Sequence, residues 1–205
     1  MFMGYGLVIK LLKSIMIKLI LISVVAYLAG SVNFAIIFFK LTGKGDPRLL
    51  FSGNAGTTNV YRQAGFFWAA VIFLLDIGRA VLIAILTVHW LPSSFIPWAG
   101  FFLVLGNSFP CFHNFFGGKG VAAFLGFTAF LVPLAAMAAA GSWLLVYGIC
   151  RRPFIASFFM AFLLAAGQAH FFNFSGVAVT GAAATFILIL FNHRRNVRGM
   201  MRVKE

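Results

Sequence analysis

Acidic residues are nearly absent from this sequence. Only three of its 205 residues are Asp or Glu, and charged residues of all kinds make up 9%, against about 25% in a soluble domain. The three acids, Asp46, Asp76 and Glu205, are too far apart in sequence to suggest a catalytic carboxylate pair, and no Ser-His-Asp order is present. Any chemistry must therefore use cations, amides, hydroxyls or an imidazole.

Cysteine is scarce as well. Cys111 and Cys150 stand alone, and neither the CxxC spacing nor the HExxH pattern of metal sites occurs. We therefore predict no zinc or iron–sulfur site, and the sequence points to no other metal or cofactor.

Apolar residues are what the chain has in abundance. They make up 62% of it, and 27 of them are Phe, more than a soluble core of this size could bury. The fold class that this composition predicts is all-α, in a polytopic integral membrane protein.

Cations outnumber acids by 16 to 3, which gives a formal charge of +13. They lie in short clusters between apolar runs. This placement favours anionic lipid headgroups and phosphorylated substrates as partners, and not nucleic acid.

Six apolar runs are separated by polar connections. The runs are Leu19–Phe39, Phe66–Trp90, Phe95–Phe112, Val121–Ile149, Phe154–Phe172 and Val177–Phe191. Lys or Arg occurs in the connections Lys40–Gly65, His113–Gly120 and Cys150–Pro153 and in the tail from Asn192. The first run is longer than the apolar region of a signal peptide, so we expect an uncleaved first span.

Basic connections are expected on the cytoplasmic side. Lys119 and Arg151 flank the long run Val121–Ile149, and they share a side only if this run crosses twice, turning near Pro133. The count is then seven spans, with the N-terminus outside and the C-terminus cytoplasmic. Each half-run would have about 14 residues, or about 21 Å, which is less than a ~30 Å hydrocarbon core.

The N-terminal lysines oppose this orientation. Lys10, Lys13 and Lys18 would lie outside, against the usual charge rule. We therefore divide the chain into a basic segment, residues 1–18, that lies at the membrane interface, and a single transmembrane domain, residues 19–205.

Two charges lie inside the second run. Asp76 and Arg79 are three residues apart, so they share a helical face and can pair. Charges within a membrane are costly and often functional. A pair that only orients the helix explains them equally well, and both readings stay open.

The longest connection carries short polar side chains, two glycines and two arginines. Gly53 and Gly56 allow positive φ and close approach to a ligand, while Arg48 and Arg62 offer forked cations that suit phosphate. The polar side chains are those of Ser52, Asn54, Thr57, Thr58 and Asn59. We predict a phosphate or headgroup site here; the alternative is a loop that merely caps the next helix.

A second glycine-rich segment, Gly117-Gly118-Lys119-Gly120, directly precedes an apolar run. Successive N–H groups can form a concave nest, a helix N-terminus adds positive potential, and Lys119 adds a full charge. This segment predicts an anion site, with a tight turn between helices as the alternative. The P-loop spacing is missing, so ATP is not implied.

The C-terminal tail is basic. The simplest interpretation of this tail is an anchor at the membrane surface. His193 and Asn196 are three residues apart and face the same way if the last helix continues through them.

Taken in order, these segments resemble the bacterial acyl-phosphate:glycerol-3-phosphate acyltransferase family, over nearly the whole chain from about Tyr27. The resemblance is carried by Gly30-Ser31, Asp46-Pro47-Arg48, Ser52–Arg62, Gly106-x-x-Phe109-Pro110-x-Phe112, Gly117–Gly120, His193-x-x-Asn196 and Glu205.

The resemblance implies an enzyme of phospholipid synthesis in the bacterial inner membrane, with its site at the cytoplasmic face and no cofactor. It would transfer a fatty acyl group from acyl phosphate to the 1-hydroxyl of glycerol 3-phosphate, giving lysophosphatidic acid and phosphate. The implied catalytic residues are Ser31, Arg48, Lys119, His193 and Asn196. We expect substrate contacts from Ser52, Gly53, Asn54, Thr57, Thr58, Asn59, Arg62, Asn107, Gly117, Gly118 and Gly120. Asp76, Arg79 and Glu205 would be structural, and we expect a monomer.

The chain resembles a divergent member of this family. The family usually has His at the position of Asn107 and Lys at that of Phe116, and a serine-containing stretch where Arg152-Pro153-Phe154 stands. These departures also fit a relative that binds lipid phosphate without catalysis. A small anion or lipid transporter is a further alternative, although no internal repeat is visible.

Overall fold

The structure is a computed structural model that describes residues 2–202, with side chains described for residues 8–201. The predicted structural acid Glu205 lies outside the described residues. The long helices are α1 (Phe2–Ser31), α3 (Thr57–Trp90), α4 (Ile96–Ser108), α5 (Val121–Leu131), α6 (Pro133–Cys150), α7 (Pro153–Phe171) and α8 (Gly176–Asn192). Shorter ones are α2 (Phe34–Leu41), α9 (Arg194–Arg202) and the 3-10 turns η1 (Pro47–Leu49), η2 (Ser93–Phe95) and η3 (Cys111–His113).

The described chain is all-helical, as predicted. Five helical segments are long and apolar enough to cross a membrane, or six if α8 and α9, bent by 46° at their junction, count as one span. Helix α5 has only 11 residues, too few to cross a bilayer alone.

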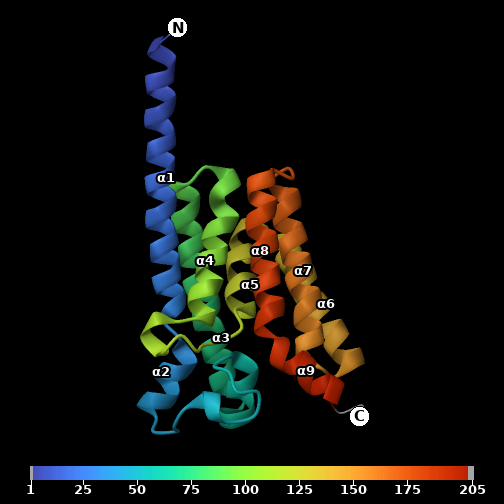
Figure 1. Cartoon of the computed structure of the whole chain (residues 1–205). Helices are drawn as coiled ribbons and strands as arrows, with labels where there is room; N and C mark the ends of the chain where they lie inside the picture. Colours follow the sequence, from blue (N-terminus) through green and yellow to red (C-terminus); the bar gives the residue numbers. More distant parts are fainter. Residues whose placement is uncertain (1, 203–205) are drawn as a thin grey trace.

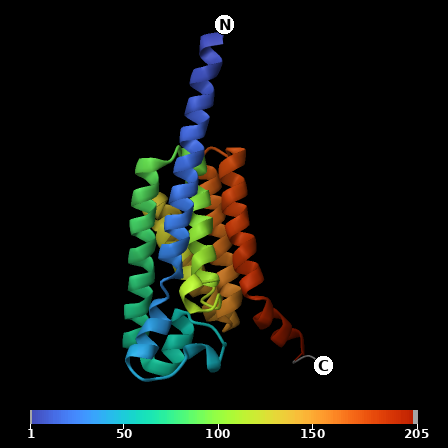
Figure 2. The same cartoon turned by 60° about the vertical axis from the view of Figure 1, so that its left-hand side comes forward.

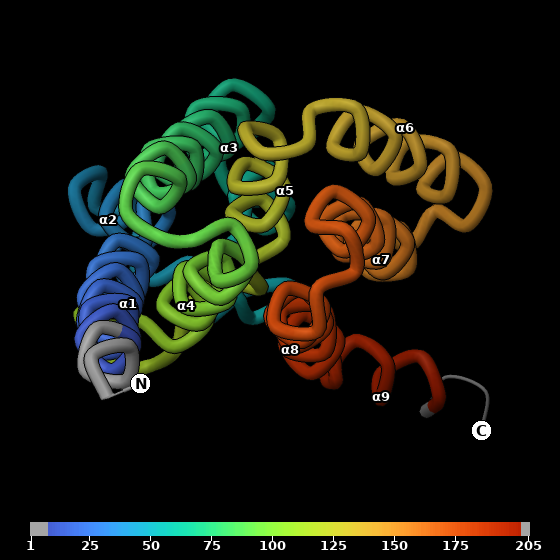
Figure 3. Tube along the Cα trace, turned by 90° about the horizontal axis from the view of Figure 1, so that it is seen from above, coloured from blue at the N-terminus to red at the C-terminus, as the bar shows by residue number. Residues whose placement is uncertain are grey.

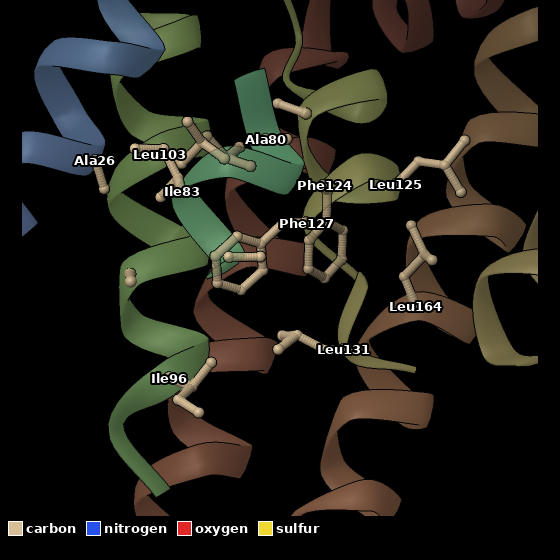
Figure 4. Packing of buried hydrophobic residues seen from close by; sticks show 14 of the residues in the cluster. Ala26, Ala80, Ile83, Ile96, Leu103, Phe124, Leu125, Phe127, Leu131 and Leu164 are labelled. Carbon is tan, nitrogen blue, oxygen red and sulfur yellow. The ribbon is translucent and has the colours of Figure 1, made fainter. Parts of the chain in front are cut away.

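The helices form an upright bundle in which α5 occupies the middle, between α3 and α4 on one side and α6 and α7 on the other (Figure 3). Its side chains Phe124 and Phe127 are fully buried and form the centre of the core with Leu103, Leu131 and Leu164 (Figure 4). Because α5 is enclosed by other helices, its short length leaves little of it facing lipid.

Glycines bring α1 and α4 into backbone contact. A Cβ on Gly30 would lie 2.9 Å from the backbone nitrogen of Asn107, and one on Gly106 would collide with the carbonyl oxygen of Tyr27. Small residues allow membrane helices to approach this closely. This contact fixes the end of α1 beside the loop that follows α4.

The basic connections gather at one end of the bundle. The segment between α2 and α3, the loop before α5, the turn between α6 and α7, and α9 all lie at the lower end in Figure 1 and Figure 2. The N-terminus lies at the opposite end (Figure 1). The predicted grouping of the basic connections is therefore confirmed for the described chain.

The turn near Pro133 is also confirmed. Helix α5 ends at Leu131, Val132 has non-helical backbone angles, and α6 begins at Pro133, so the long apolar run is two helices. Their lengths, 11 and 18 residues, are less equal than the halves that we expected.

Two predicted boundaries are wrong. The first run is not one helix, because α1 ends at Ser31 and Asn33 caps α2 by accepting a hydrogen bond from the N–H of Ile36. The second run begins at Thr57 and not at Phe66, with a kink at Gly65, whose φ of 84° suits glycine. Hydrophobicity alone missed residues 57–65, the polar start of this helix.

The N-terminal lysines lie on a continuous helix. Helix α1 runs through residues 10, 13 and 18 without a break and projects beyond the other helices (Figure 1). The division into residues 1–18 and 19–205 is therefore not marked by a bend, and it stays a prediction.

Candidate active site

A cavity of about 870 Å³ lies at the basic end of the bundle, lined by residues of α3 to α7, of the loops before α3 and α5, and of the tail. Most of the predicted catalytic and binding residues line it: Ser52, Asn54, Thr57, Thr58, Arg62, Asn107, Gly118, Lys119, Gly120, His193 and Asn196. Five others do not, namely Ser31, Arg48, Gly53, Asn59 and Gly117. These five residues lie in or contact the loops that carry the cavity-lining residues.

Asn59 organises the loop before α3. Its side-chain Nδ2 donates to the carbonyl oxygens of Pro47 (2.7 Å), Leu50 (3.2 Å) and Asn54 (2.9 Å), and the residue is fully buried. An amide that has three backbone acceptors cannot also donate to a ligand. Asn59 therefore fixes the loop, and Gly53, with a φ of 63°, turns it.

Arg48 ties this loop to the glycine-rich one. Its guanidinium pairs with Asp46 at 2.7 Å and donates to the carbonyl oxygens of His113 (2.9 Å) and Phe116 (2.6 Å). Hydrogen bonds from Arg48 hold the pKa of the Asp46 carboxyl below its usual value. The contacts made by Arg48 thus position both loops, while its predicted catalytic role stays a prediction.

Ser31 serves a similar purpose. Its hydroxyl donates to the carbonyl oxygen of Tyr27 (2.9 Å) and accepts from the N–H of Cys111 (3.3 Å), so it joins α1 to η3. Both contacts lie outside the cavity, and a role for Ser31 in catalysis also stays a prediction.

The predicted nest is partly wrong. The N–H groups of Gly117 and Gly118 already donate to the carbonyl oxygens of Ser108 (3.1 Å) and Asn107 (2.9 Å). The N–H groups that can bind an anion are instead those of the first turn of α5, after Gly120. The first bond of α5 runs from Phe124 to Gly120, so the N–H groups of Val121, Ala122 and Ala123 are unused by the helix, and all three residues line the cavity.

A second helix N-terminus faces the same cavity. Helix α3 begins at Thr57 after Gly56, which provides no side-chain cap. The Thr57 hydroxyl is buried, and it has no hydrogen-bond partner among the described residues. Two helix N-termini and an unpaired hydroxyl therefore point to an anionic ligand.

Lys119 connects the glycine-rich loop to the tail. Its ammonium donates to Oδ1 of Asn196 at 2.6 Å. Burial lowers the pKa of Lys119 from 10.5 to about 8, and the charge of Arg62 lowers it in the same direction. Lys119 is therefore charged at neutral pH but weakly hydrated, which strengthens its attraction for an anion.

His193 is buried at the junction of α8 and α9. Its Nδ1 donates to the carbonyl oxygen of Ile189 at 2.8 Å, because a carbonyl can only accept. The remaining nitrogen, Nε2, is the one free for a ligand or a proton. The last helix does not continue as we assumed, since it bends by 46° here, yet His193 and Asn196 both line the cavity.

Sequence patterns missed part of the lining. Arg151 and Arg152 lie at the cavity, where we had treated them only as a basic connection. The apolar wall, which includes Phe73, Trp143 and Met160, also escaped detection, because apolar residues in a membrane protein give no signal that separates a cavity from lipid-facing surface. Asp76 pairs with Arg79 at 2.9 Å as predicted, but it lines the cavity too.

A family profile described as "Glycerol-3-phosphate acyltransferase" matches residues 20–203. The chain belongs to this family. A glycerol-3-phosphate acyltransferase of Pseudomonas aeruginosa is 35% identical over 190 residues, which cover 90% of this chain and 97% of that protein. The Azotobacter vinelandii enzyme of the same name is 41% identical over 138 residues, covering 67% of this chain and 73% of that protein.

Two solved structures of an acyltransferase are similar to this chain. The crystal structure of PlsY (YgiH), an integral membrane glycerol 3-phosphate acyltransferase, in its glycerol 3-phosphate form has a TM-score of 0.83 and 28% identity. The superposition covers 91% of this chain and 94% of the PlsY chain. The lysophosphatidic acid form of the same enzyme gives a TM-score of 0.80. The acyltransferase class and the membrane location that we predicted are therefore confirmed.

Positions that depart from the family pattern have partners in this acyltransferase. Asn107 accepts a hydrogen bond from Arg79 at 3.1 Å. The ring of Phe116 lies 5.9 Å from the guanidinium carbon of Arg48 and 5.2 Å from that of Arg195, as in cation–π contacts. The side chains at both positions therefore have specific contacts, although neither is the usual one for the family.

Proposed function

We propose that this protein transfers a fatty acyl group from acyl phosphate to the 1-hydroxyl of glycerol 3-phosphate, giving lysophosphatidic acid and phosphate. The observation that carries the proposal is one cavity with a cationic end, framed by two helix N-termini, and an apolar wall. Acyl phosphate has the same two parts. Membership of the glycerol-3-phosphate acyltransferase family supports the acceptor.

The cationic end suits two phosphoryl groups. Lys119, Arg62, Arg151 and Arg152 line it together with the free N–H groups that begin α3 and α5. Two anionic substrates repel one another, and these charges would offset that repulsion. The glycerol 3-phosphate and lysophosphatidic acid forms of the solved relative PlsY support the same acceptor and product.

The apolar wall suits the acyl chain. It is contributed by α3, α5, α6 and α7 through side chains such as Phe66, Phe73, Leu125, Leu144 and Met160. Such a wall can replace the lipid tails around the acyl chain of a membrane-dissolved acyl phosphate, whereas free phosphate has no apolar part that would contact it.

In the proposed reaction the 1-hydroxyl oxygen attacks the acyl carbonyl carbon. The bond between that carbon and the phosphate oxygen breaks, and phosphate leaves with its electron pair, held by Lys119 and the N–H groups of α5. The hydroxyl proton passes to the departing phosphate or to Nε2 of His193. Burial of His193 beside the charge of Lys119 opposes a positive imidazole, which favours phosphate as the acceptor.

We also propose seven crossings by α1, α3, α4, α5, α6, α7 and α8 in the bacterial inner membrane. The basic end of the bundle would then be cytoplasmic, with the N-terminus outside. The cavity lies at this basic end, where the water-soluble acceptor is available. We further propose that the enzyme works as a monomer in phospholipid synthesis, because the described residues of one chain suffice to form a cavity with a cationic end and an apolar wall.

The test is phosphate release from palmitoyl phosphate by the purified protein in lipid, with and without glycerol 3-phosphate. We expect release that depends on the acceptor and is lost in Lys119→Met. Lys44→Met, which removes an exposed lysine outside the cavity, is the matched control and should behave as wild type. Binding of acyl phosphate without release would indicate a non-catalytic relative, and flux of an anion across liposomes would indicate a transporter; either result overturns the proposal.

A further inference from the structure

One buried arginine holds two of the residues that line the cavity. The Nη2 group of Arg79 donates to Oδ1 of Asp76 at 2.9 Å and to Oδ1 of Asn107 at 3.1 Å. Asp76 is 8% exposed, Arg79 8% and Asn107 5%. The two acceptors come from α3 and α4, and the shared donor places them side by side in the cavity wall.

Arg79 is itself fixed by the break between α1 and α2. Its Nη1 donates to the carbonyl oxygens of Ala29 (3.3 Å) and Gly30 (3.2 Å) and contacts that of Val32. The carbonyls of Gly30 and Val32 accept no backbone hydrogen bond within the described chain because α1 stops at Ser31, and that of Ala29 also accepts from the N–H of Val32. A guanidinium that is held from behind in this way cannot turn toward the cavity without losing several hydrogen bonds.

The bonds to Arg79 decide which atoms face the ligand. A guanidinium only donates, so Asn107 must turn Oδ1 toward it and Nδ2 away from it. Nδ2 then lies beside Gly118 in the glycine-rich loop, 2.8 Å from where a Cβ of that residue would stand. Among the described side chains, none accepts from Nδ2 of Asn107 and none donates to Oδ2 of Asp76.

The wall therefore offers one donor and one acceptor, including the only carboxylate among the described residues of the lining. A phosphoryl group would be repelled by the carboxylate of Asp76. A hydroxyl can donate to the carboxylate and accept from the amide at the same time. The chemistry of the pair thus fits a neutral alcohol better than either phosphate.

We propose that Asp76 and Asn107, positioned by Arg79, recognise the hydroxyl of the acceptor that is not acylated. In glycerol 3-phosphate this is the 2-hydroxyl, since the 1-hydroxyl reacts. The inference rests on the proposed function and adds the group that selects a vicinal diol phosphate over a simpler alcohol phosphate. Arg79 is a positioning residue that does not touch the substrate.

The test compares two acceptors, glycerol 3-phosphate and 3-hydroxypropyl phosphate, which keeps the reacting hydroxyl and lacks the other. Wild type should prefer glycerol 3-phosphate by about tenfold or more in kcat/KM, the effect of one hydrogen bond in a buried site. In Asn107→Ala this preference should fall to nearly one. Gln168→Ala removes a buried amide that does not line the cavity, so the preference should be kept there.

Asn107→Asp provides a second variant of nearly the same shape, which keeps the acceptor for Arg79 and removes the donor. It too should lose the preference, and it serves if Asn107→Ala does not fold. If both acceptors lose activity equally in a folded variant, the role of Asn107 is structural and the inference is wrong. If wild type acylates neither acceptor, the proposed function fails instead.

Discussion

The pKa of Lys119 makes the expected activity depend on pH in a way that can be worked out from the structure. Lys119 lies in the loop before α5, outside the membrane-crossing helices, and burial lowers its pKa to about 8. About nine-tenths of the protein would carry the charge at pH 7 and about one-tenth at pH 9. If this ammonium holds a phosphoryl group, kcat/KM should fall about tenfold between these pH values, and about tenfold more by pH 10.

The assay is kcat/KM for glycerol 3-phosphate from pH 7 to pH 10, because this ratio reports groups of the free enzyme. The substrates do not contribute to the decline, since phosphate monoesters have their second pKa near 6. Lys119→Arg is the matched variant. A guanidinium stays charged above pH 12, so the decline should disappear from the measured range even if the activity is lower throughout.

Two results would refute this reasoning. A flat profile for wild type up to pH 10 would show that the charge of Lys119 does not matter or that its pKa is ordinary. An unchanged decline near pH 8 in Lys119→Arg would assign the titration to another group.

Three further predictions concern the supports of the cavity and the proton. Gly106→Ala should destabilise the protein by about 1–3 kcal/mol in thermal unfolding, because its Cβ has no room at α1, whereas Gly141→Ala, with open space around it, should not. Arg48→Lys should lower kcat/KM and the unfolding temperature together, since lysine cannot hold a carboxylate and two carbonyls in the same fork; a drop in activity with unchanged stability would favour direct catalysis. His193→Gln should keep most of its kcat if phosphate takes the proton, and a loss of 100-fold or more, about the contribution of a general base, would assign that role to the imidazole.

The membrane class and the grouping of the basic connections at one end of the bundle, where the candidate site lies, could be predicted from the sequence. Composition requires lipid as solvent, and the placement of Lys and Arg groups the four basic connections at one end. The glycine-rich loop and the pair Asp76–Arg79 were found because spacing along the chain decides them. Local patterns carry such information because neighbours in sequence are neighbours in space.

Which side chains face the cavity was decided only by the tertiary structure. In the sequence, Arg48 and Lys119 are equally good candidates for binding phosphate. In the structure, Arg48 is bound to Asp46 and to carbonyls 65 and 68 residues away, while Lys119 faces the cavity beside Asn196. Asp76 looked structural because its pairing is visible in sequence and its exposure to the cavity is not. The sequence determines the chemical groups available at the basic end of the bundle. Packing between distant segments determines which of these groups can bind a ligand, because a donor or acceptor that is already hydrogen-bonded within the protein is not available to it.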